Sequence, residues 1–329
     1  DSQKPEFVRA KVIVNASGPW IDSVLSKTSH PSQRLIGGTK GSHLVVRSFR
    51  GSPAHAVYVE AESDGRPFFV IPWNKHYLIG TTDVRFERDP DEVDCESWEV
   101  DYLLKETNNI FPDAKLERDD ICYVYSGVRP LAFSKDNDEQ SITRRHFIRE
   151  HAEFGNLLSI VGGKLTTYRS LSEECVDLVF RKIGRASPKC RTHEVPLPGA
   201  TSTSVGNEEE EMIASWPGVV QERLSSIYGT RISELAKLCR ARPELTEPFT
   251  RNKDAIVAEI LHSFKSEFAS TLSDCLLRRT MIGLNCDQGS DDVETAARIA
   301  QKAFGWSDER VNQELSRYKQ VIGNMSNHL

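Results

Sequence analysis

The stretch Leu158–Arg169 constrains the fold of this chain more than any other. Within it, Ser159–Val161 is short and rich in apolar residues, which predicts a buried strand that stops at Gly162-Gly163. A helical spacing of apolar residues then begins at Leu165. This order places backbone N–H groups at the positive end of a helix, where they can bind electron-rich oxygen. An ordinary strand-to-helix turn has the same pattern, but Lys164 adds a cation there and favours a binding site.

A second strand, turn and helix are predicted within Lys11–Trp20. Ser17 suits the N-cap of the helix, Gly18 permits a tight turn, and Pro19 suits the first helical turn. The chain starts at Asp1 and reaches this strand within a few residues, which suggests a sequence cut from something longer.

The pattern between Arg34 and Arg145 is one of short β-rich runs separated by turn residues. The expected strands are 43–47, 56–60, 67–71, 76–80 and 121–125. One helical stretch, 97–111, interrupts them. This mixture predicts a mainly antiparallel sheet with a helix on one face, an α+β layer.

The remainder of the chain is predicted to be helical after a linker at 196–211, which is rich in Pro, Gly and Ser/Thr and ends in four acids. The acidic run indicates a solvated helix start. The expected helices are 217–228, 231–241, 253–264, 268–283, 291–304 and 307–322. A capping box is predicted at Asp291 and Glu294.

Composition excludes several classes of function. The chain has 42 Lys and Arg against 48 Asp and Glu, a formal charge of −6, and no strongly basic run, so nucleic acid is not an expected partner. No apolar run is long enough to span a membrane. The seven cysteines are scattered without a C-x-x-C motif, which predicts a reduced intracellular protein without a cysteine metal site; no metal is expected.

Three further stretches concentrate residues that packing alone does not require. Gly37–His43 is a glycine-rich approach to a strand, and it ends in a histidine. A histidine at a strand edge is more often structural or solvated, so His43 by itself decides nothing. Gly80–Asp83 follows another strand and alone indicates a turn with an Asx cap. In Tyr125–Leu131, Arg129 lies at the end of an apolar strand.

Arg129 is the strongest candidate among these residues for binding an anion. Burial of a guanidinium group is costly unless an anion pairs with it. Arg144 is a second arginine nearby in sequence, and two arginines can clamp a phosphate through bidentate contacts. The residues therefore predict an enzyme for a small anionic substrate, without naming its reaction.

Taken in order, these motifs resemble those of the FAD-dependent glycerol-3-phosphate dehydrogenases, within the D-amino-acid-oxidase-like flavoprotein superfamily. The matching motifs are Val14–Trp20, Lys40–His43, Val70–Trp73, Ile79–Asp83, Tyr125–Leu131, Ile142–Arg144 and Gly162–Arg169. The tail, with Tyr228-Gly229 and Asp274–Thr280, is similar to the helical C-terminal domain of that family.

One departure is plain. Members of the family open with a strand-G-x-G-x-x-G-helix fingerprint for the ADP half of FAD, which is missing here, and Leu35–Gly41 does not fit its spacing. The resemblance therefore implies a fragment that is inactive alone. It also implies an α/β and α+β fold, in which 1–28 and 155–190 are the remnant of a Rossmann-like FAD-binding domain. Residues 29–154 would form the α+β substrate-binding domain, and 196–329 the all-α domain.

By resemblance, the complete enzyme oxidises sn-glycerol 3-phosphate to dihydroxyacetone phosphate, with hydride transfer to FAD and electrons passed to quinone. Arg129 and Arg144 would bind the substrate phosphate, and His43 would accept the proton of the C2 hydroxyl. Lys164 would lie near the flavin ring. The other residues implied in cofactor binding are Ser17, Gly18, Pro19, Gly163, Leu165 and Thr166.

Three alternatives remain open at this point. A glycerol-3-phosphate oxidase would use O2 as acceptor, another superfamily member would oxidise an amine, and a truncated paralogue would be non-catalytic. The resemblance also suggests a homodimer and peripheral association with an inner membrane, either on the bacterial cytoplasmic face or in mitochondria.

Overall fold

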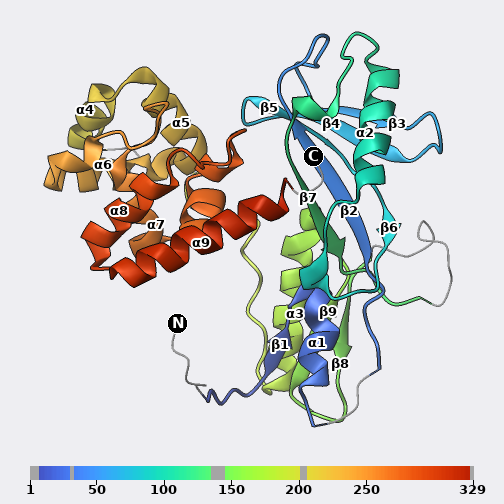
Figure 1. The fold of residues 1–329 in the computed structure, drawn as a ribbon. Coiled ribbons are helices and arrows are strands. Elements are labelled where there is room, and N and C mark those ends of the chain that lie inside the picture. The colour runs from blue at the N-terminus through green and yellow to red at the C-terminus, as the bar shows by residue number, and fades with distance from the viewer. Residues whose placement is uncertain (1–6, 30–32, 135–144, 201–205, 327–329) are drawn as a thin grey trace. The chain divides into compact units, whose positions relative to one another are not determined.

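The computed structural model describes residues 7–29, 33–134, 145–200 and 206–326. The chain forms two compact units (Figure 1). Unit 1 comprises Asp1–His43, Gly80–Glu99 and Tyr125–Val195. Unit 2 comprises Leu44–Ile79, Val100–Val124 and Pro196–Leu329.

The strands form two sheets. They are β1 (Ile13–Asn15), β2 (Thr39–Val46), β3 (Val57–Glu60), β4 (Pro67–Trp73), β5 (His76–Gly80), β6 (Val84–Arg85), β7 (Ile121–Arg129), β8 (Phe147–Glu150) and β9 (Leu157–Val161). The small sheet has the order β1-β9-β8, and the larger one β3-β4-β5-β2-β6 with β7 also paired to β2. Strand β1 is parallel to β9, whereas β2 is antiparallel to β6, and β3 to β4.

The helices are α1 (Ile21–Ser26), α2 (Ser97–Ile110), α3 (Tyr168–Lys182), α4 (Asn207–Ser215), α5 (Gly218–Tyr228), α6 (Ile232–Ala241), α7 (Val257–Ser266), α8 (Val293–Phe304) and α9 (Asp308–Asn324). Helix α1 packs on the small sheet because Ile21 and Leu25 share a core with Leu157 and Val161 of β9. The predicted fold class, a mixed α/β structure with a mainly antiparallel sheet and a helical C-terminal part, is confirmed.

The helical part of unit 2 follows from simple periodicity. In α8, Val293, Ala296, Ala297 and Ala300 recur on one face, and all four are buried. The helix ends at Gly305, whose φ of 67° is the left-handed conformation typical of a glycine after a helix. The predicted segment 268–283 differs, since it contains a π-helical turn at Asp274–Arg279. Within the described ranges, no helix combines the length and apolar character needed to cross a bilayer.

Both predicted helix caps are wrong in detail. Ser17 stands at the N-cap position of a 3-10 turn, but its hydroxyl accepts no hydrogen bond from the turn and donates to Asn15 Oδ1 at 2.6 Å. Helix α8 begins after Asp292 and not after the predicted Asp291, and the Asp292 side chain makes no capping hydrogen bond. Ser17 bonds to a neighbour two residues away, whereas Asp292 accepts from the backbone N–H of Arg251, 41 residues away. Sequence spacing reveals neither choice of partner.

The prediction of fully reduced cysteines is wrong for one pair. Cys122 and Cys286, 164 residues apart in sequence, form a disulfide within unit 2. The other five cysteines are free. Scattered spacing could not reveal this pair, because only the fold brings the ends of so long a loop together.

Candidate active site

Strand β2 organises the candidate site through the alternation of its side chains. Successive residues of a strand point to opposite faces. Gly41 and His43 adjoin Arg129 and Gly80 respectively, whereas Lys40 and Ser42 contact Glu99 of helix α2. One face of β2 therefore adjoins the candidate catalytic residues, and the opposite face packs on helix α2.

Arg129, at the end of β7, is fixed by neighbours on β2 and after β5. Its Nη1 forms an ion pair with Asp83 Oδ1 at 3.0 Å. Its Nη2 donates to Thr81 Oγ1 at 2.9 Å and to the Thr82 carbonyl at 3.1 Å. The anion that burial of Arg129 requires is thus supplied by Asp83, in the motif that sequence suggested was a turn. The side chain is still 23% exposed, so a further anion can reach it.

Two glycines make room for the candidate side chains. A Cβ at Gly41 would lie 2.1 Å from Arg129 Nη2 and 2.3 Å from Thr81 Oγ1. A Cβ at Gly80 would lie 2.5 Å from Cδ2 of His43. Side chains at these two positions would displace Arg129 or His43, so both glycines belong to the site even though they carry no functional group.

His43 lies in an apolar setting that keeps it neutral. Its ring stacks on Tyr125 with centroids 5.0 Å apart and an interplanar angle of 11°. Its Nδ1 is buried and has no hydrogen-bond partner among the described residues. Burial, and second the positive charge of Arg129, lower the pKa of His43 from 6.5 to about 4. A neutral imidazole with an unpartnered nitrogen can accept a proton from a bound molecule.

This lowered pKa predicts a dependence of stability on pH. Between pH 6.5 and about 4, the unfolded chain protonates His43 and the folded chain does not, so stability falls as the pH falls through this range. His43→Asn removes this contribution. In urea titrations, we expect the urea concentration at the midpoint of unfolding to fall less on acidification for His43→Asn than for the wild type. The matched variant of an exposed histidine, His55→Asn, keeps the wild-type loss. Equal losses in all three proteins would contradict the buried neutral state.

Below β2 lies a buried polar cluster that sequence analysis missed. Lys40 and Glu99, 1% and 0% exposed, form an ion pair at 2.7 Å. Glu99 Oε1 also accepts from Ser42 Oγ at 2.8 Å and from Thr82 Oγ1 at 2.6 Å, and Ser42 shares a hydrogen bond with Ser126. Desolvation lowers the pKa of Lys40, but its hydrogen bonds and charge attraction to the carboxylates outweigh this and raise the pKa overall.

A signal for Glu99 was present in the sequence. Glu99 shares a helical face with Leu103, four residues on, and with Glu106, seven residues on, and all three are fully buried. An acid on the apolar stripe of a helix needs a buried partner.

The two strand-to-helix turns leave the small sheet at the same end of its parallel strands. In the parallel pair β1 and β9, Asn15 lies opposite Ser159, so the turns that follow both strands leave the sheet at the same end. The first turn contains Ser17, Gly18 and Pro19, and the second contains Gly162 to Thr166. Local patterns predicted both turns, and the resemblance implied that both contribute to one cofactor site.

The second turn presents backbone and exposed side chains. Gly162 and Gly163 have φ values of 75° and 101°, which favour glycine. Lys164, Leu165 and Thr166 are exposed, with Leu165 at 89%. The turn leads through a 3-10 segment, Leu165–Thr167, into α3, as the sequence predicted. An apolar side chain in solvent beside positive-φ glycines fits a flat ring system resting on this turn, so these residues fit a flavin.

A pocket in unit 1 lies between the first turn and the residues just before β2. It is lined by Pro19 from the first turn, by Gly38 immediately before β2 and by Val128 of β7. Arg34 and Arg88 line its wall together with the acids Asp22, Glu87 and Asp89, so its lining has charges of both signs. The structure thus brings together His43 and Arg129, and separately the turns of Pro19 and Gly163. Arg144, the second predicted phosphate ligand, lies outside the described residues.

Two family models match the chain. The model described as FAD dependent oxidoreductase matches residues 2–169. The model described as C-terminal domain of alpha-glycerophosphate oxidase matches residues 190–311.

Curated relatives carry the name that the motifs suggested. The chain is 38% identical to a glycerol-3-phosphate dehydrogenase of Synechocystis sp., over 94% of this chain and 58% of the relative. It is 34% identical to the aerobic glycerol-3-phosphate dehydrogenase of Escherichia coli, over 96% of this chain and 62% of the relative. The chain therefore spans about three fifths of the length of these relatives.

A solved structure agrees with the fold. The glycerol-3-phosphate dehydrogenase of Bacillus halodurans, solved in complex with FAD, matches 98% of this chain and 64% of its own, with a TM-score of 0.80 and 26% identity. The predicted resemblance to FAD-dependent glycerol-3-phosphate dehydrogenases is confirmed by the sequence and structure matches together.

Proposed function

Because the chain belongs to the FAD-dependent oxidoreductase family, we propose that the full-length protein oxidises sn-glycerol 3-phosphate to dihydroxyacetone phosphate. One observation carries the proposal: β2 and β7 hold a fixed cation, Arg129, and a neutral base, His43, close to each other. Such a pair suits a substrate with a phosphate a few bonds from a hydroxyl group. The names of the relatives support glycerol 3-phosphate as that substrate.

Each residue has a defined role in this proposal. Arg129, oriented by Asp83, binds the substrate phosphate, and Arg144 is its second ligand. His43 accepts the proton of the C2 hydroxyl. Its lowered pKa keeps it unprotonated at neutral pH, ready for that step.

The two turns are assigned to the cofactor. When bound, FAD supplies the acceptor for the hydride that leaves C2 of the substrate. The residues that would hold it are Ser17, Gly18, Pro19, Gly163, Lys164, Leu165 and Thr166. Lys164 and the helix that follows favour negative charge at this edge, and the exposed Leu165 supplies an apolar surface.

The cofactor site proposed here is completed by a segment that this chain does not contain. Strand β1 is at the edge of its sheet, and its Ile13 and Val14 are 51% and 39% exposed. Exposed apolar residues on an edge strand suit pairing with further chain. We infer that the chain alone does not turn over.

Quinone is the proposed electron acceptor. The full-length protein would associate peripherally with a bacterial or mitochondrial inner membrane and would act as a homodimer. An oxidase that reduces O2 differs in a measurable product, hydrogen peroxide.

The test uses the purified full-length protein. We expect flavin absorbance, reduction of a soluble quinone analogue that depends on glycerol 3-phosphate, and little peroxide. An amine substrate serves as the control and should give no turnover. Formation of one hydrogen peroxide per substrate oxidised would show that the protein is an oxidase and not a dehydrogenase. A bound flavin that does not respond to glycerol 3-phosphate would overturn the proposed substrate.

A further inference from the structure

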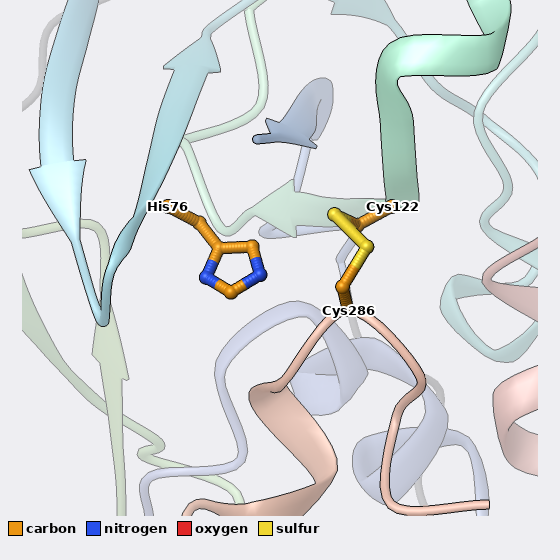
Figure 2. A group of neighbouring side chains, drawn as sticks. All are labelled: His76, Cys122 and Cys286. Carbon is orange, nitrogen blue, oxygen red and sulfur yellow. A yellow bond between two sulfur atoms is a disulfide. The ribbon is translucent and has the colours of Figure 1, made fainter. Parts of the chain in front are cut away.

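Three side chains of metal-ligand type meet in unit 2, and none of them is among the residues assigned above. They are His76 at the start of β5, Cys122 in β7, and Cys286 in the segment before α8. One ligand atom from each lies within 4.8 Å of the other two. Figure 2 shows one ring nitrogen of His76 facing the two sulfur atoms, which are joined as a disulfide.

The hydrogen bonding of His76 leaves one ring nitrogen for a metal. Nδ1 lies 2.8 Å from the carbonyl oxygen of Asn74. A carbonyl oxygen only accepts, so Nδ1 carries the proton and Nε2 keeps its lone pair. Donation of the other ring N–H to a backbone carbonyl is the usual arrangement of metal-binding histidines, because it fixes the tautomer and the ring orientation.

Contacts other than the disulfide keep the two cysteines close. Their Cα atoms are 4.7 Å apart. Beside Cys122, the Tyr123 hydroxyl donates to the Leu284 carbonyl at 3.0 Å. Beyond Cys286, the fully buried Tyr318 donates to the Gln288 carbonyl at 2.7 Å. Both ends of the Cys286 segment are therefore anchored independently of the S–S bond, and the two thiols stay neighbours after reduction.

We propose that the reduced form of this cluster binds one Zn²⁺ through Cys122 Sγ, Cys286 Sγ and His76 Nε2. Two thiolates and an imidazole form an established ligand set for zinc, with a fourth position left to water. Zinc–sulfur bonds of about 2.3 Å in tetrahedral geometry require the sulfurs to separate to roughly 3.7 Å. Rotation of the two side chains supplies this separation.

The proposed site is coupled to the redox state of the pair. An added dithiol reduces the Cys122–Cys286 disulfide. The dithiol gives up two electrons and two protons and becomes a disulfide itself, and the two cysteines become thiols. Zinc binding then releases these two protons, since the thiolate is the ligand. Reoxidation of the two sulfurs removes both thiolate ligands and releases the metal, so disulfide and zinc exclude each other.

Zinc binding to the full-length protein tests the proposal. The protein is either reduced with a dithiol and desalted without oxygen, or left oxidised, and bound zinc is measured with a chromogenic chelator. We expect one more Zn²⁺ per chain in the reduced sample than in the oxidised one. Co²⁺ in place of Zn²⁺ should produce thiolate-to-metal charge-transfer absorption in the reduced sample only.

Three variants separate ligation from general thiol chemistry. Cys286→Ser should lose the extra zinc. His76→Gln keeps both cysteines but should weaken zinc affinity by more than roughly 10-fold. Loss of a residue that only hydrogen-bonds to a metal ligand already has about that effect, and His76 is itself a proposed ligand. Cys190→Ser, at a free and half-buried cysteine, should bind as the wild type does. Unchanged zinc affinity in His76→Gln, or no extra zinc in a protein whose thiols titrate as reduced, would overturn the proposal.

Discussion

Replacement of Arg129 by alanine in the full-length protein is expected to raise KM for glycerol 3-phosphate and to lower kcat/KM by roughly 10²-fold or more. The variant removes the charged hydrogen bonds to the substrate phosphate. It also leaves Asp83, the ion-pair partner at 3.0 Å, as an uncompensated anion near that phosphate. Steady-state kinetics over a range of substrate concentrations measure the effect. Arg129→Lys should not restore activity, because an ammonium group lacks the planar fork whose two nitrogens contact Asp83 and Thr81 separately.

Arg85 provides the matched control for Arg129. It lies on β6, next to β2, its side chain is 25% exposed against 23% for Arg129, and it is paired with Glu87. Arg85→Ala should leave KM within about threefold of the wild type, because Arg85 is paired at 3.6 Å with a Glu87 that is 59% exposed, and such a pair contributes little. Urea unfolding of both variants separates lost stability from lost binding. An unchanged KM in Arg129→Ala would remove this residue from the substrate site.

Replacement of Glu99 by alanine is expected to lower the free energy of unfolding by about 3–5 kcal/mol. It leaves the buried Lys40 cation with one largely solvated partner, Glu96, and removes the acceptor of the Ser42 and Thr82 hydroxyls. Urea titrations at neutral pH measure the loss. The contribution of the pair is fully present below pH 10.5 and is lost as the pH rises through the raised pKa of Lys40.

Glu96 provides the comparison for Glu99, because both carboxylates contact the same lysine. Glu96 is 45% exposed, so Glu96→Ala should cost less than about 1 kcal/mol. The double variant Lys40→Met/Glu99→Leu should recover much of the loss of Glu99→Ala, because no unpaired charge stays buried. A loss that is equal for Glu96→Ala and Glu99→Ala would show that the buried ion pair has no special role.

Much of the secondary structure could be predicted from the sequence. Strands β3, β4, β5 and β9 and helices α2, α5, α6, α8 and α9 lie within a few residues of their predicted ranges, because their alternation or helical spacing is regular. The start of β2 was missed. It begins at Thr39 and not at His43. Glycines such as Gly41 indicate a loop in a sequence, unless it is known that a neighbouring group requires a glycine inside the strand. At Gly41 that group is Arg129, whose approach only the fold reveals.

The candidate site was partly predictable. His43, Arg129 and the two glycine turns were found from local motifs. The partners of these residues were not found, because Asp83 lies 46 residues from Arg129 and Glu99 lies 57 residues from Ser42. Local patterns contain no information on such pairs, and the same holds for the Cys122–Cys286 bond.

The alternation of β2 has a consequence for how this protein can change length during evolution. Odd positions of Thr39–His43 adjoin Arg129 and Gly80, and even positions contact Glu99. Insertion or deletion of a single residue inside this stretch reverses the face of every side chain beyond it. Lys40 would then turn toward the substrate, and His43 toward the acid of α2. Homologues that keep this site must therefore conserve the residue parity of this stretch.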